Sequence, residues 1–196
     1  MRTSWFRALN KIGYRRLFVF ETRLARTPSR MQPKVKAAIR RLRAEDKSDF
    51  TVLFPGKTAL FRQRLTRGRQ CWGAWCDGSL RQVIWTATGE AEIDYLGCRL
   101  VLSRQEFYTF EAWTHPAWRR LGLHQATKTT CYQAFFDKGF RRGLAAVLPE
   151  NRPSIAALNQ LGSRKIGRLV SIGWGRWRRC FYRPEAGSHR PVTVIR

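Results

Sequence analysis

A hairpin in the middle of the chain constrains the fold more than any other feature of the sequence. Residues 71–76 and 80–86 are two runs rich in aromatic and small apolar side chains, and the pair Asp77-Gly78 stands between them. A glycine accepts the positive backbone φ that a tight hairpin turn needs, so this pattern predicts two antiparallel strands. We expect two further extended runs, residues 98–102 and 107–113, to continue the hairpin as an antiparallel meander.

The hydrophobic pattern changes from strands to helices after Pro116. Apolar residues between Leu121 and Phe135 recur at a spacing of three and four, which predicts a helix that ends at Gly139. Together with the strands, this order of elements predicts a mixed α+β protein. The other expected elements are a first strand from Val35 that ends near Glu45, helices at 46–54 and 57–67, a buried strand at 144–148, a helix at 154–161 and a closing hairpin of residues 166–172 and 174–182.

The start of the chain carries a basic amphipathic pattern. Apolar or small residues recur at helical spacing from Phe6 to Leu24, with basic residues opposite, which predicts a helix. A strand around residues 17–20, where aromatic and β-branched side chains crowd together, is the alternative. Prolines then mark a boundary. We expect a basic N-terminal extension, one domain and a loose tail: residues 1–34, 35–184 and 185–196.

The chain is strongly basic, with 38 Lys and Arg against 13 Asp and Glu and a formal net charge of +25. A surface with this charge repels itself unless an anionic partner faces it. That partner could be RNA, an anionic membrane surface, an acidic acyl carrier protein or a phosphorylated cofactor. A generically basic surface without such a partner is the alternative.

The five cysteines are odd in number and stand mostly alone, and the three histidines do not cluster with them at zinc-ligand spacing. This usage predicts a reducing, cytoplasmic setting and no structural metal. The sequence has no continuous apolar run long enough for a signal peptide or a membrane span. We therefore expect a soluble protein or one that lies peripherally at a membrane.

The segment of residues 114–124 carries the most informative chemistry. It joins a predicted strand to a predicted helix, and an exposed helix N-terminus offers free backbone N–H groups to an anion. Arg119 and Arg120 add positive charge, while Gly122 lets the backbone come close to a phosphate. The segment therefore predicts a pyrophosphate site, although a simple turn is the alternative.

The same segment is similar to the acyl-CoA loop of the GNAT superfamily. That loop reads Arg or Gln, two residues, Gly, one residue, then Gly or Ala, and a hydrophobic-His-Pro stretch commonly precedes it. Arg119 and Gly122 match the loop, and His115-Pro116 matches the stretch before it. His124 departs from the pattern, because the family prefers a small residue there.

The resemblance extends over roughly residues 35–182. Downstream of the loop, Asn151 and Ser154 reproduce the Asn-x-x-Ser spacing that follows the family's fifth strand, and the central hairpin resembles the family's second and third strands. Two departures are Leu158, where many relatives carry a tyrosine that protonates the leaving thiolate, and Ser163, which replaces a usual phenylalanine.

The resemblance implies a central, mostly antiparallel twisted sheet that splays between its fourth and fifth strands and is flanked by helices. It also implies an N-acyltransferase that passes an acyl group from acetyl-CoA or another acyl-CoA to an amine by direct attack. The thioester carbonyl is expected on backbone N–H groups near the end of the fourth strand. The expected donor-binding residues are Trp113, Thr114, Arg119, Arg120, Leu121, Gly122, Leu123, His124, Asn151 and Ser154.

The attacking amine must be neutral, so a carboxylate or imidazole should take its proton. Glu111 is the first candidate, because it lies on the fourth-strand segment three residues before the donor loop. Pairing with one of the many arginines is the alternative role for this acid. His115 is the second candidate, and Tyr182 and Cys180 are conceivable acids.

Two other functions remain open from the sequence. The chain could be a basic module that binds RNA or a membrane surface on the same scaffold without turnover, with tryptophans interleaved among arginines to stack on bases. It could also be an acyltransferase that uses an acyl carrier protein or an aminoacyl-tRNA.

Overall fold

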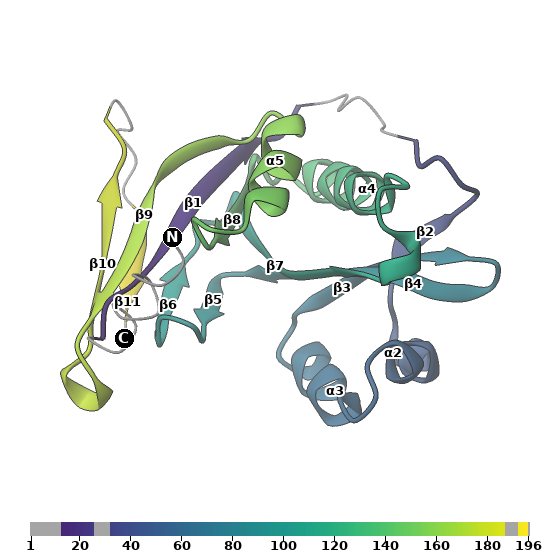
Figure 1. Cartoon of the computed structure of the whole chain (residues 1–196), viewed down its shortest axis with the longest axis horizontal. Coiled ribbons are helices and arrows are strands. Elements are labelled where there is room, and N and C mark those ends of the chain that lie inside the picture. Colours follow the sequence, from purple (N-terminus) through teal and green to yellow (C-terminus); the bar gives the residue numbers. More distant parts are fainter. Residues whose placement is uncertain (1–12, 26–31, 187–191, 196) are drawn as a thin grey trace. The chain divides into compact units, whose positions relative to one another are not determined.

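The structure is a computed structural model that describes residues 13–25, 32–186 and 192–195. The described residues form a mixed α+β protein with mostly antiparallel sheets, as the sequence predicts (Figure 1). The chain divides into two compact units. Unit 1 comprises Met1–Thr22, Gly89–Ser103 and Leu144–Arg196, and unit 2 comprises Arg23–Thr88 and Arg104–Gly143.

Unit 2 contains an antiparallel sheet in the order β7–β4–β3–β2. The predicted central hairpin is confirmed as β3 and β4, joined by a two-residue turn. Asp77 and Gly78 both have positive φ there, +49° and +70°, as the favoured tight hairpin turn requires. The strands are β2 (Ala38–Arg41), β3 (Gln70–Cys76), β4 (Ser79–Thr88) and β7 (Glu106–Thr114).

Helices pack on both faces of this sheet (Figure 1). Successive strand residues point to opposite faces, and β4 shows the consequence. Trp85 packs against Phe50 and Phe61, whereas its neighbour Ile84 packs on the other face with Phe135. The predicted helices are confirmed as α2 (Lys47–Leu53) and α3 (Thr58–Thr66) on the first face and α4 (Leu123–Asp137) on the second.

Unit 1 contains strands in the order β10–β9–β1–β8 and the helix α5 (Arg152–Gln160). Phe20, Ala145 and Leu158 form its buried core. The closing hairpin is confirmed, with the 3₁₀ turn η3 (Gly175–Trp177) between its strands. The strands are β1 (Arg15–Arg23), β8 (Arg142–Val147), β9 (Arg164–Ile172) and β10 (Arg179–Pro184).

The helix predicted near the N-terminus is wrong for residues 15–23, which form β1, and the alternative of a strand at 17–20 is confirmed. Val19 and Phe20 are consecutive and both buried, so both faces of β1 are covered. An interior strand that is apolar on both faces can imitate the spacing of a helix. The rest of the predicted helix, residues 6–12, lies outside the described residues.

Two further expectations need correction. Residues 98–101 do not continue the central meander, because β6 (Cys98–Val101) forms a local hairpin with β5 (Glu90–Ile93). The tail is not loose throughout, because β11 (Thr193–Ile195) pairs with β6. The expected division into extension, domain and tail stays a prediction. So does the splay between the fourth and fifth strands, β7 and β8, which fall largely in different units.

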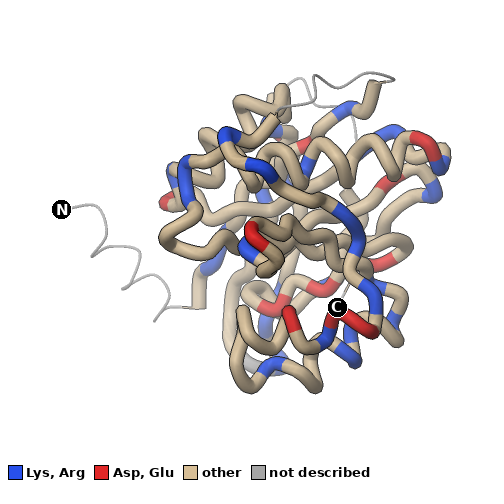
Figure 2. The backbone as a smooth tube through the Cα atoms, turned by 90° about the vertical axis from the view of Figure 1, so that its right-hand side faces the viewer, with Lys and Arg blue, Asp and Glu red and all other residues tan. Residues whose placement is uncertain are grey.

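Basic residues occur along the whole backbone that Figure 2 displays, with acidic residues interspersed. Charge alone therefore does not single out one element as the face toward an anionic partner. Among the described residues, no helix has the length and apolar character that a bilayer-spanning segment requires.

Candidate functional site

The predicted strand–loop–helix arrangement is confirmed in unit 2. The end of β7 leads through His115 and the 3₁₀ turn η2 (Pro116–Trp118) to the start of α4. The loop between them contains two left-handed residues, Arg120 with φ +63° and Gly122 with φ +78°. The Arg119 side chain folds back on the loop, where its Nε donates to the carbonyl oxygen of Thr114 at 3.2 Å.

The N-terminus of α4 is suited to an anion. Its N-cap residue is Gly122, which has no side chain to accept hydrogen bonds from the first-turn N–H groups. These groups have no acceptor within the helix, and they carry the positive end of the helix dipole. Arg119 and Arg120 are both exposed beside them. The residues present therefore fit a pyrophosphate group.

Gly122 has a second role that the sequence did not reveal. A Cβ atom at this position would lie only 3.3 Å from the Cα of Pro33. Next to that contact, the backbone N–H of Lys34 donates to the carbonyl oxygen of Leu121 at 2.9 Å. The small size of Gly122 thus lets residues 32–34 pack on the loop, so a substitution there would disturb folding as well as any anion site.

His124 lies in the first turn of α4, and its charge state bears on that site. Burial, together with the nearby ammonium group of Lys128, lowers the pKa of His124 to about 4. The imidazole is therefore neutral at pH 7. The positive charge at this helix end comes from Arg119, Arg120 and the helix dipole instead.

Glu111 occupies a β-bulge in β7. Between the paired residues Phe110 and Trp113, two residues of β7 lie opposite the single residue Ile84 of β4, and Glu111 has a positive φ of +44°. A bulge of this kind bends the strand and leaves the extra residue outside the regular ladder. The bulge lies just before Trp113 and Thr114. Backbone N–H groups near these two residues are the ones expected to bind the thioester carbonyl.

The Glu111 carboxylate is held by an arginine from α3. The guanidinium of Arg64 donates to both carboxylate oxygens, at 2.6 and 2.5 Å, and lies over the rings of Trp85 and Phe110. This is the pairing that the sequence left as the alternative. The base role of Glu111 stays a prediction, but both of its oxygens already have a strong donor.

We expect Glu111→Gln to act mainly on stability. The substitution removes one charge of the ion pair, and Glu111 is about half exposed, so the coupling to Arg64 should be about 1 kcal/mol or less. A double-mutant cycle of Glu111→Gln and Arg64→Gln in urea denaturation measures this coupling. The same variants should lose less than about tenfold in kcat, whereas a general base would cost about 10²-fold or more.

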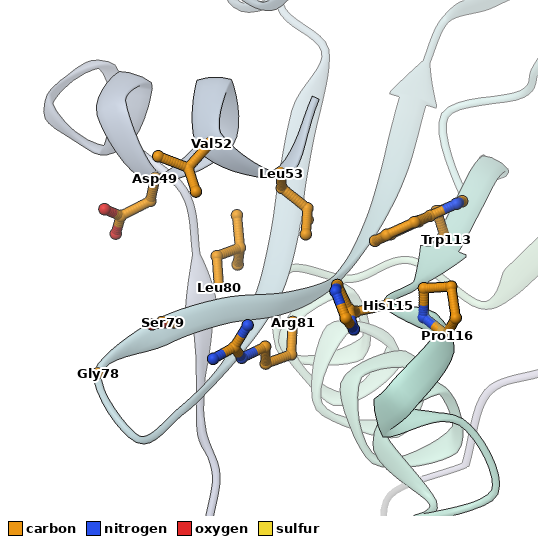
Figure 3. Close-up of a pocket in the computed structure, with 10 residues that line it drawn as sticks. All are labelled: Asp49, Val52, Leu53, Gly78, Ser79, Leu80, Arg81, Trp113, His115 and Pro116. Carbon is orange, nitrogen blue, oxygen red and sulfur yellow. The ribbon is translucent and has the colours of Figure 1, made fainter. Parts of the chain in front are cut away.

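A pocket of about 450 Å³ opens at the end of β7 in unit 2 (Figure 3). Trp113 and His115 lie at one end of it and Asp49 at the other, with Leu53 and Leu80 between them. The pocket is lined by Asp49, Val52, Leu53, Gly78, Ser79, Leu80, Arg81, Trp113, His115 and Pro116.

Two nitrogen atoms of this lining are buried and have no hydrogen-bond partner among the described residues, His115 Nδ1 and Arg81 Nε. The imidazole of His115 stands perpendicular to the indole of Trp113, with ring centroids 6.0 Å apart. At the other end, Asp49 accepts a hydrogen bond from Trp75 Nε1 at 2.8 Å. The two buried nitrogen atoms therefore carry a desolvation cost.

The other expected site residues lie in unit 1. Asn151 Oδ1 accepts from the backbone N–H of Ser154 at 3.2 Å and thus caps α5, which explains the Asn-x-x-Ser spacing structurally. The hydroxyl of Tyr182 donates to the carbonyl oxygen of Ile166 at 2.7 Å. The thiol of Cys180 lies 3.2 Å from the carbonyl oxygen of Leu96. Their roles toward a donor stay predictions.

The described ranges contain no group of three or more His, Cys, Asp or Glu that could hold a metal ion. No family model and no curated protein sequence matches the chain at a significant level.

Solved structures do resemble the chain. A GCN5-related N-acetyltransferase from Sphaerobacter thermophilus matches with a TM-score of 0.58 and 15% identity, over 86% of this chain and 55% of that one. A Drosophila protein matches with a TM-score of 0.55 and 19% identity, over 88% and 57% of the two chains. This chain thus spans little more than half the length of either protein.

A third structure is that of the aminoglycoside N-acetyltransferase AAC(6')-Iy in complex with CoA. It matches with a TM-score of 0.54 and 17% identity, over 74% of this chain and 94% of that one. Identities this low show the fold alone. The chain has the fold of the GNAT superfamily of N-acetyltransferases.

Proposed function

We propose that this protein is an N-acyltransferase that moves an acyl group from an acyl-CoA to an amine. The observation that carries the proposal is the uncapped N-terminus of α4 beside Arg119 and Arg120, which suits a pyrophosphate. The fold supports it, since AAC(6')-Iy shares the fold and its structure contains CoA. The first-turn N–H groups and the two guanidinium groups would hold the pyrophosphate of the donor.

An acyl-CoA supplies a thioester whose carbonyl carbon is open to attack by an amine. The acceptor would enter the pocket beside Trp113 and His115. During transfer a C–N bond forms and the C–S bond breaks, so CoA leaves as its thiolate and the amine loses a proton. We assign acceptance of that proton to the imidazole of His115, because this side chain lines the pocket while Glu111 is held by Arg64.

Transfer is tested by measuring thiol release from acetyl-CoA in the presence of a panel of primary amines, with the acylated amines identified by mass spectrometry. Amine-dependent thiol release with a matching acylated product supports the proposal. If CoA and acetyl-CoA fail to bind the folded protein, the proposed function is wrong.

Donor binding has its own test. We expect the double substitution Arg119→Gln/Arg120→Gln to weaken CoA binding by about 10- to 100-fold in calorimetry, because charge-assisted hydrogen bonds to the phosphates are lost. The double substitution Arg62→Gln/Arg104→Gln removes the same charge from exposed positions of unit 2 and is the matched control. An equal loss of affinity in the control would mean that general electrostatics, and not this loop, attracts CoA.

A further inference from the structure

The turn of the β9–β10 hairpin in unit 1 exposes large apolar side chains. We call residues 172–179 the hairpin tip, and Figure 1 shows this turn at the free end of β9 and β10. Trp177 is 74% exposed, Trp174 57% and Ile172 45%. Two indoles and an aliphatic side chain thus gather within six residues on the surface of one turn, which is unusual for a surface without a partner.

The turn that carries these side chains has a defined backbone structure. Gly173 has a φ of +97°, and a Cβ atom there would lie 2.7 Å from the carbonyl oxygen of Trp177. The backbone N–H of Trp177 donates to the oxygen of Trp174 at 2.9 Å, and that of Gly173 donates to the oxygen of Gly13 at 3.1 Å. A side chain at position 173 would be strained and would clash with the backbone, so glycine is needed for this turn.

The charged residues of the segment that forms the tip and its two strands have one sign, and Lys165 pairs with Glu185 just beyond it. No acidic residue occurs from 164 to 184. Arg179 lies directly opposite Ile172 in the strand pairing, and the guanidinium of Arg176 lies over the ring of Trp177 at 5.3 Å. The basic residues of this segment are Arg164, Lys165, Arg168, Arg176, Arg178, Arg179 and Arg183.

We propose that the hairpin tip binds the surface of an anionic lipid bilayer, with Trp174, Trp177 and Ile172 at the level of the headgroups. Indoles favour the membrane–water interface because one edge is polar and the rest apolar. Arginines beside them would remain among anionic headgroups, where each is worth about fivefold in binding. A bilayer fits better than nucleic acid because Ile172 offers no flat face on which a base could stack.

The test measures how much of the full-length protein sediments with vesicles of phosphatidylcholine, with and without phosphatidylglycerol. We expect binding only to the anionic vesicles. Trp174→Ala/Trp177→Ala should lower the partition coefficient about tenfold or more, and Arg176→Gln/Arg179→Gln about 25-fold. Trp177→Ala alone removes little packing because this side chain is mostly exposed, so its loss of about threefold or more should occur at an unchanged melting temperature.

Two matched controls accompany these variants. Val101→Ala changes an exposed apolar residue elsewhere in unit 1, and Arg62→Gln/Arg104→Gln removes two exposed charges from unit 2. Both should bind anionic vesicles within about threefold of the wild type. The proposal is overturned if the wild type ignores anionic vesicles or if the tryptophan variants bind them equally well. It is also overturned if the tryptophan substitutions weaken binding to a single-stranded RNA oligonucleotide and leave vesicle binding unchanged.

Discussion

Replacement of His115 by asparagine is expected to lower kcat by about 10²- to 10⁴-fold, because it removes the group that takes the proton of the amine. Affinity for CoA should stay within about threefold, since His115 lines the pocket and is not part of the proposed pyrophosphate site at Arg119, Arg120 and the first turn of α4. Asparagine is of similar size and can still donate a hydrogen bond, so the pocket should keep its shape.

The decisive measurement is the pH dependence of kcat/KM with the best amine substrate. The wild type should show an ionisation that the variant lacks, and imidazole added to His115→Ala should restore part of the rate. If the pH profile of the variant is unchanged, a water molecule or another residue takes the proton. A large loss of kcat in Glu111→Gln would return that role to the carboxylate.

Replacement of Lys128 by methionine is expected to stabilise the protein. Lys128 lies in α4 with only 3% of its surface exposed, and its ammonium group lies 5.5 Å from the ring centroid of Tyr132. Burial lowers the pKa of Lys128 to about 8, against 10.5 for the ordinary group. Such a shift corresponds to a destabilisation of about 3 kcal/mol as an upper limit, because each pKa unit is worth about 1.4 kcal/mol. Methionine keeps the length of the side chain without the charge.

The stability gained by Lys128→Met should decrease as the pH rises. Below pH 8 the amine is protonated in both the folded and the unfolded chain, so the folded state carries the whole cost of the buried charge. Between pH 8 and 10.5 the folded state releases its proton first, and the stability of the wild type relative to Lys128→Met rises. Above 10.5 the amine is neutral in both states and the gain from the substitution disappears.

Urea denaturation of Lys128→Met and wild type at pH 7 and pH 10 measures this difference. Lys138→Met, which changes an exposed lysine just after the same helix, is the control and should shift the free energy of unfolding by no more than about 0.5 kcal/mol. Lys128→Met should also raise the pKa of His124, because the Lys128 ammonium helps to lower it. A variant that is less stable than wild type at pH 7 would mean that the buried ammonium makes a net stabilising contact.

The elements that the sequence predicted best are those with local causes. The Asp77-Gly78 turn depends on two residues that accept positive φ, and α4 follows from apolar spacing within one segment that ends at a glycine. The loop before α4 was likewise predictable, because its glycine and arginines lie within four residues of one another. In each case the information that determines the structure lies within a few residues.

The elements that were predicted wrongly depend on partners far away in the sequence. β1 is a strand because it pairs with β9, about 150 residues later, and because both of its faces are covered. β11 is ordered by its pairing with β6. Apolar spacing alone does not distinguish a strand buried on both faces from a helix, since in both cases apolar residues occur at positions three and four apart in the sequence.

The candidate site divides in the same way. The sequence by itself determined that a strand, a glycine-containing basic loop and a helix follow one another, because these are local patterns. Only the tertiary structure decided that Arg64 holds Glu111 and that residues 32–34 pack against Gly122. It also brought His115 and Asp49 to the two ends of one pocket. Side chains 47 or more residues apart meet only when the sheet of unit 2 has formed and its helices have packed, and hydrophobic burial drives that step without leaving a short-range pattern in the sequence.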